Sequence, residues 1–112
     1  MKAQLYLGTM YVEGRGVPQD YAEAMRWYRK VAEQGHASAQ YNLAFLYRHG
    51  EGVPRNHVEA FKWFSLSARN GNQFARKALK ELSKEMSPVQ IGEAKGLSYE
   101  WKPKAGDSQT EQ

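Results

Sequence analysis

"EGRGVPQDYAEAMRWY", residues 13–28, and "GEGVPRNHVEAFKWF", residues 50–64, are two versions of one pattern in a chain of 112 residues. In both, Gly-x-Gly-Val-Pro is followed at a fixed distance by Glu-Ala and then by Trp with a second aromatic residue. Shifting the sequence by 36 residues aligns the two copies, with 13 identities in 36 positions. A fixed period between about 20 and 50 residues indicates a solenoid of stacked supersecondary units.

Each unit is predicted to contain two helices joined by the glycine-rich loop. Apolar residues recur at helical spacing before the first glycine and again after the proline. Gly14 and Gly50 stand where a chain leaves a helix through a left-handed residue. Pro18 and Pro54 prevent a helix from continuing through the loop. Because a helix rather than a strand precedes it, the loop is interpreted as a structural turn and not as a phosphate cradle.

The second helix of each unit begins after a good N-cap residue. Asp20 and Asn56 occupy this position, and each is followed three residues later by an acid, Glu23 or Glu59. This spacing predicts a complete capping box, in which the glutamate side chain reaches back to the cap amide.

Residues at matching positions of the two copies carry a resemblance to a known family. They are Ala3, Leu7, Gly8, Tyr11, Gly14, Gly16, Asp20, Ala24, Trp27, Tyr28, Ala32 and Gly35, and then Ala39, Leu43, Tyr47, Gly50, Gly52, Asn56, Ala60, Trp63, Phe64, Ala68 and Gly71. Through them the chain resembles the Sel-one-like repeat family, relatives of the tetratricopeptide repeats. The resemblance implies an all-α fold, a right-handed α-solenoid of stacked antiparallel helix pairs with about three helical hairpins and six helices. It also implies a role as adaptor or scaffold in protein complexes.

The expected organisation is a repeat domain at 1–102 and a disordered tail at 103–112, which has no large apolar residue. The domain comprises repeats at 1–36 and 37–72 and a degenerate capping hairpin at 73–102. The third unit lacks the glycine loop, and Ser87 with Gln90 predicts a capping box at the start of its last helix. One apolar stripe is predicted along that helix, consisting of Ile91, Ala94, Leu97 and Trp101.

Composition argues against several classes of function. There are no cysteines, and His36, His49 and His57 lack the spacing of a metal site. No serine lies in a nucleophile-elbow context, so no catalytic residue, metal or cofactor is expected. Some cysteine-rich relatives of the family are described as binding or hydrolysing β-lactams. A β-lactamase-like enzyme is the least favoured alternative here, because the residues for that chemistry are missing.

Charge and hydropathy also limit the expected partners. The net charge is +4, but basic residues are scattered, which disfavours nucleic-acid binding. No apolar run has the length of a signal peptide or membrane span, so a soluble, by default cytoplasmic, protein with no membrane partner is expected. Bacterial relatives occur both exported and in the cytoplasm, and the compartment stays open.

The predicted binding surface is the concave wall. In the tetratricopeptide arrangement this wall is lined by positions of the first helix in each unit. The residues assigned to it are Leu5, Thr9, Tyr41, Phe45, Arg48, His49, Phe74, Lys77 and Lys84. We expect the aromatic residues to anchor a partner peptide or protein and the basic residues to attract its acidic groups. The alternative is that Tyr41 and Phe45 pack against a neighbouring helix.

A second functional hypothesis concerns the stacking edges. The first helix begins almost at Met1, without a capping residue or a polar outer helix. Either the chain is a segment of a longer repeat array, or a homodimer covers the edge of the N-terminal repeat. In both cases the partner would be held by the edges of the solenoid rather than by its concave wall.

Overall fold

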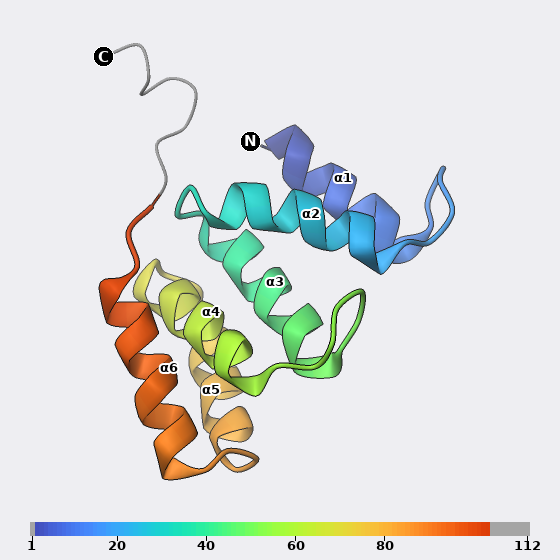
Figure 1. The fold of residues 1–112 in the computed structure, drawn as a ribbon. Helices are drawn as coiled ribbons and strands as arrows, with labels where there is room; N and C mark the ends of the chain where they lie inside the picture. The colour runs from blue at the N-terminus through green and yellow to red at the C-terminus, as the bar shows by residue number, and fades with distance from the viewer. Residues whose placement is uncertain (1, 104–112) are drawn as a thin grey trace, which may run out of the picture.

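Six helices and no strand make up the part of the chain that the computed structural model describes, which is the backbone of residues 2–103 and the side chains of residues 8–103. The helices are α1 (Lys2–Glu13), α2 (Tyr21–Ala32), α3 (Ala37–His49), α4 (His57–Arg69), α5 (Ala75–Ser83) and α6 (Pro88–Glu100) (Figure 1). The predicted all-α solenoid is confirmed. The predicted tail beyond Pro103, and the side chains of Ala3, Leu5 and Leu7, lie outside the described residues.

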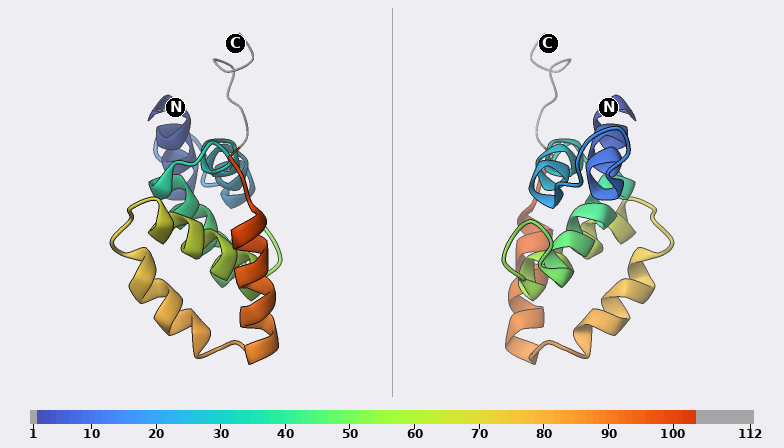
Figure 2. Two further views of the ribbon diagram at one scale, coloured as in Figure 1. Left: turned by 90° about the vertical axis from the view of Figure 1, so that its left-hand side faces the viewer. Right: turned by 90° about the vertical axis from the view of Figure 1, so that its right-hand side faces the viewer.

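The helices pack as successive antiparallel pairs. α1 pairs with α2 and α3 with α4, while α2 also packs on α3 and so joins the two repeats. Both α5 and α6 pack on α4, and they make little contact with one another. Figure 2 shows them diverging from the short connection between them. In the third unit, α5 and α6 therefore each pack against α4 and diverge from one another.

The two glycine loops close in the same way. Gly14 and Gly50 adopt positive φ angles of 70° and 72°, as predicted for helix exits. The amide of Asp20 then donates to the carbonyl of Tyr11 at 2.8 Å, and the amide of Asn56 donates to that of Tyr47 at 3.0 Å. These bonds tie the start of each second helix to the end of the first.

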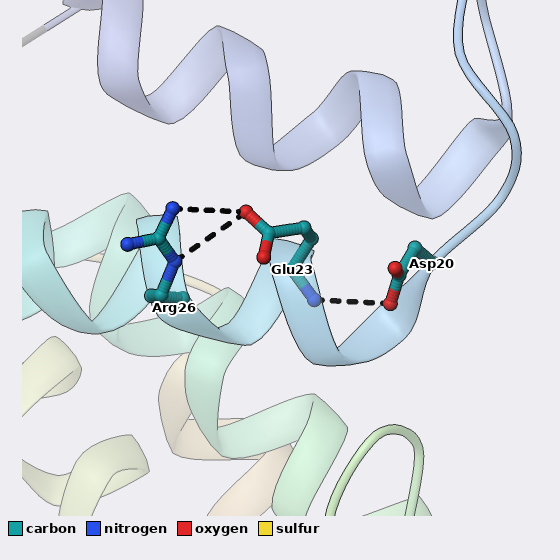
Figure 3. A network of polar contacts seen from close by, with 3 residues as sticks. All are labelled: Asp20, Glu23 and Arg26. Carbon is teal, nitrogen blue, oxygen red and sulfur yellow. Dashed lines mark hydrogen bonds and ion pairs between the residues drawn. The ribbon is translucent and has the colours of Figure 1, made fainter.

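The predicted capping boxes of the two repeats are only half formed. The Asp20 and Asn56 side chains accept from the amides three residues on, at 3.1 and 3.0 Å. The prediction that Glu23 and Glu59 reach back was wrong, because each cap amide already donates to the preceding helix. Glu23 instead pairs with Arg26 at 3.1 Å (Figure 3). The complete box predicted at the start of α6 is confirmed, with both Ser87–Gln90 bonds present.

A buried glutamine links the repeats inside the core. Gln40 on α3 is fully buried, and its Nε2 donates to the carbonyl of Ala32 at the end of α2 at 3.1 Å. Its Oε1 accepts from Asn70 Nδ2 at 3.0 Å, at the end of α4. One side chain thus joins three helix ends. The apolar core around it is formed by Met25, Tyr28, Val31, Leu43, Leu46, Phe61, Trp63, Phe64, Leu66 and Leu82.

The inner face of α6 differs from the predicted stripe. Ala94 and Ser98 are buried, whereas Leu97 is exposed, so the prediction for Leu97 was wrong. Ser98 faces α4 because its carbonyl accepts from Arg69 Nη1 at 3.2 Å, and a small side chain permits that approach. At the end of α6, Trp101 packs edge-on against Trp63, with ring centroids 5.8 Å apart.

The contact between the repeats is tight at Gly52. A Cβ there would lie 2.6 Å from the backbone carbonyl carbon of Tyr21 and 2.8 Å from the amide nitrogen of Ala22. Gly16 occupies the same position in the first repeat. In the described part of the chain, Met10 Cε at 3.6 Å is the one atom within 4 Å of a Cβ at Gly16.

This difference predicts that a glycine-to-alanine substitution destabilises the protein more at position 52 than at position 16. Both glycines have positive φ, so alanine at either site costs about 1–2 kcal/mol of unfolding free energy. Gly52→Ala must also move backbone, which adds about 1–3 kcal/mol. Urea unfolding of the two variants measures the difference. Equal losses would show that Gly52 does not set the distance between the repeats.

Candidate functional site

Two adjoining hollows lie on either side of one turn of α3. The first, called the α1–α3 pocket, has a volume of about 330 Å³. Its lining residues are Val12, Tyr21, Tyr28, Tyr41, Asn42, Phe45, Leu46 and Glu51. The second, the α3–α5 pocket, has a volume of about 340 Å³. Its lining residues are Tyr41, Phe45, Arg48, Phe64, Phe74, Lys77, Ala78 and Glu81. Tyr41 and Phe45 border both pockets, which together form one groove.

The two pockets are the same site in successive repeats. Five positions separated by the 36-residue period line both of them. These pairs are Val12 and Arg48, Tyr28 and Phe64, Tyr41 and Lys77, Asn42 and Ala78, and Phe45 and Glu81. The groove is therefore produced by the repeat itself, while its chemistry changes from one pocket to the next.

The aromatic residues of the groove divide into packed and projecting ones. Tyr41 is half-buried and meets Phe64 edge-on, with centroids 5.4 Å apart, and lies 6.5 Å from the Phe74 ring. Phe45 is 46% exposed and Phe74 is 62% exposed. Tyr41 thus follows the packing alternative, whereas Phe45 and Phe74 project into solvent. The Phe45 ring also lies against the His49 imidazole, at 4.3 Å.

Arg48 has an intramolecular partner. Its Nη2 donates to Glu85 Oε2 at 3.0 Å, and His57 Nε2 lies 3.6 Å from the other oxygen of that carboxylate. The hydrogen bond from Arg48 lowers the pKa of Glu85 below its usual value. The expectation of Arg48 as a cation free to attract a partner's acid is therefore corrected. Lys77, by contrast, lines the α3–α5 pocket without a side-chain partner in the described part of the chain.

The other predicted residues lie around the groove. Thr9 Oγ1 is 3.1 Å from the Tyr28 hydroxyl, and burial raises the pKa of that phenol. Lys84 follows α5 as its exposed C-cap and is not among the residues that line either pocket. Leu5 lies on α1, where its side chain is not described. The structure thus gathers Tyr41, Phe45, Arg48, Phe74 and Lys77 in one groove.

Sequence reasoning missed the residues contributed by second helices and loops. Tyr21 and Tyr28 come from α2, Phe64 from α4, and Glu51 from the second glycine loop. The prediction considered first helices alone. The 36-residue period could have indicated them, because adding 36 to residue numbers that line the first pocket gives five of the residues that line the second.

The described region has neither a metal-binding cluster nor a membrane-spanning helix. Between residues 2 and 103, no three histidine or acidic side chains are grouped so that they could hold a metal ion. None of the six helices has the length and apolar character needed to cross a membrane.

Comparison with known proteins identifies the repeat. The family model described as Sel1 repeat matches residues 2–36 and 37–72. The chain belongs to the Sel1 repeat family. Sel1 repeats are generally protein-interaction modules and non-enzymatic scaffolds. No curated protein matches the chain.

Two solved Sel1-type structures are similar to this one. The first is c5321, a protective antigen of uropathogenic Escherichia coli strains that displays an SLR fold, with 36% identity and a TM-score of 0.86 over 88% of this chain. The second is a Sel1 repeat protein from Oxalobacter formigenes, with 39% identity and a TM-score of 0.72 over 75% of this chain. The chain spans only 21% and 35% of these two proteins, respectively.

The ion pair beside the groove predicts a pH effect. Because the folded-state pKa of Glu85 lies below its ordinary value of 4.5, the pair stabilises the protein at neutral pH. That contribution is lost as the pH falls through the folded-state pKa. Glu85→Gln should lower the melting temperature at pH 7 and leave it unchanged at about pH 2. An equal loss at both values would contradict a role for the charged pair.

Proposed function

We propose that this Sel1 repeat chain is an adaptor that binds a peptide segment of a partner protein in the groove on α3. The observation that carries the proposal is the pair of adjoining pockets that share Tyr41 and Phe45. A partner side chain can enter each pocket while the backbone between them crosses α3.

The exposed phenylalanines support this proposal. Phe45 and Phe74 leave apolar surface in water beside hollows large enough for a side chain. Aromatic side chains at the edge of a pocket are typical anchors of protein interfaces, because burying their rigid rings costs little conformational entropy. The groove would thus gain binding energy mainly from apolar burial.

The lining of the groove supports binding rather than catalysis. A hydrolase of the acyl-transfer type needs a nucleophile beside a base and donors for an oxyanion. The described residues of the α1–α3 pocket instead present tyrosines, a phenylalanine, aliphatic side chains, one amide and one carboxylate. The Tyr28 hydroxyl is hydrogen-bonded to Thr9, and burial raises its pKa, which disfavours its phenolate form further.

The anchors can be tested with peptides selected on the wild-type chain from a random display library. Phe45→Ala and Phe74→Ala should each weaken peptide binding by about 2 kcal/mol, roughly 30-fold, measured by fluorescence polarisation. Val89→Ala and Tyr99→Ala are matched controls, since both side chains are exposed on α6 away from the groove. Binding that all four variants leave unchanged would contradict the groove assignment.

A second candidate function rests on the open position at Gly16. In the second repeat the equivalent glycine is covered by the start of α2, whereas Gly16 faces only Met10 in the described part of the chain. We propose that this edge of α1 can take a repeat unit of a second copy.

Sedimentation equilibrium tests this edge. We expect a concentration-dependent dimer that Met10→Glu weakens about tenfold or more, because a charge would be buried at the interface. A wild-type chain that stays monomeric at high concentration would contradict the dimer and leave the groove as the binding surface.

A further inference from the structure

The groove carries an unpaired charge of opposite sign at each end. Among the described residues that line the α1–α3 pocket, Glu51 is the one charged side chain. Among those that line the α3–α5 pocket, Arg48 is paired with Glu85, whereas Lys77 and Glu81 make no ion pair. Apolar and aromatic side chains, chiefly Tyr41 and Phe45, lie between these charges and belong to both pockets.

Glu51 is available to a partner. Its side chain makes no hydrogen bond or ion pair with any residue in the described region, and it is partly exposed. Only its amide is engaged, with the carbonyl of Leu46 at 3.0 Å. This bond holds the loop backbone at Glu51, whose side chain borders the α1–α3 pocket.

Within the described residues, Lys77 is the lining cation of the other pocket that makes no side-chain hydrogen bond or ion pair. It is exposed on α5 and borders the pocket beside Phe74, whereas the charge of Arg48 is already matched by Glu85. A partner's acidic group facing Lys77 would also lie near Arg48 in the same lining. Lys77 has no ion pair in the described region, so it is the lining cation that a partner's anion can pair with.

We infer that the partner segment carries a basic residue, then an apolar residue, then an acidic residue along the groove. The basic residue would face Glu51, the apolar one would cover Tyr41 and Phe45, and the acidic one would face Lys77. This inference rests on the proposed function and adds the chemical character of the partner segment and the order of its residues along the groove. For a given direction of the bound backbone, a segment with the opposite order would place like charges together at both ends of the groove.

Charge reversal in the protein is the direct test. Random peptides displayed on phage are selected on the full wild-type chain and, in parallel, on the double variant Glu51→Lys/Lys77→Glu. Peptides from the wild-type selection should carry basic, apolar and acidic residues in the inferred order. Peptides from the double variant should carry the two charges exchanged.

Single variants measure the size of each contribution. A wild-type-selected peptide should bind Glu51→Lys and Lys77→Glu roughly tenfold more weakly, and this difference should shrink at high salt because exposed charges are screened. Glu93→Lys and Lys95→Glu, at exposed positions on α6, make the same charge changes away from the groove and should leave affinity unchanged. Circular dichroism and thermal unfolding verify that each variant folds, and Lys77→Gln supplies a milder change with a smaller loss.

The outcomes separate the inference from the proposed function. Peptides that need Phe45 and Phe74 but bind the charge variants like wild type overturn the charge order and leave the groove proposal standing. Peptides whose affinity is unchanged by the phenylalanine substitutions and by the charge reversals overturn the charge order and the groove proposal. A selection that yields no peptide dependent on the groove also overturns both.

Discussion

The second glycine loop lies very close to the start of α2. The packing of the two repeats depends on this contact. At Gly52 the backbone of one repeat lies where any larger side chain would meet the backbone of Tyr21 and Ala22. Fixing this distance seats α3 on α2 and brings Gln40 within reach of the last turn of α2. α3 lines both pockets of the groove, so this contact also positions one wall of each pocket.

Paired substitutions inside the repeats show how one scaffold gives two chemically different pockets. In the first repeat Gly8 permits close approach of the Tyr28 ring, since a Cβ at Gly8 would lie 2.6 Å from Tyr28 Cε1. The second repeat has Ala44 and Phe64 at the same positions. The first pocket thereby keeps a phenol hydrogen-bonded to Thr9, while the second has at the equivalent position the Phe64 ring, which has no hydroxyl. The fold needs an aromatic ring at this position, and the groove uses the difference between the two rings.

Features fixed by local sequence could be predicted, and those fixed by distant contacts could not. The positive φ of the loop glycines and the N-caps at Asp20 and Asn56 depend on a few neighbouring residues, so the sequence pattern was sufficient. The orientation of Glu23 depends on whether the cap amide is already bonded to Tyr11. Likewise, Leu97 is exposed because contacts between α6 and α4 bury Ser98 instead.

The same division applies to the candidate site. The sequence assigned Phe45 and Phe74 to the concave wall because the repeat requires no aromatic residue there, while packing of Phe45 against a neighbouring helix stayed open. In the structure both rings are exposed. Arg48 on α3 pairs with Glu85, which lies 37 positions later between α5 and α6. No local sequence pattern indicates this pair. The position of Glu51 beside the groove was equally hidden, because a loop residue of one repeat borders a pocket formed mainly by helices of both repeats.

Chemical-shift mapping tests most directly whether a peptide binds in the groove on α3. Backbone amides of the ¹⁵N-labelled chain would be followed during titration with a peptide selected on the wild type. We expect the largest shifts on residues 41–48 of α3, on the loop at Glu51 and on residues 74–81, with little change along α6. Shifts concentrated on the outer edge of α1 or on the exposed face of α6, with α3 unaffected, would contradict it.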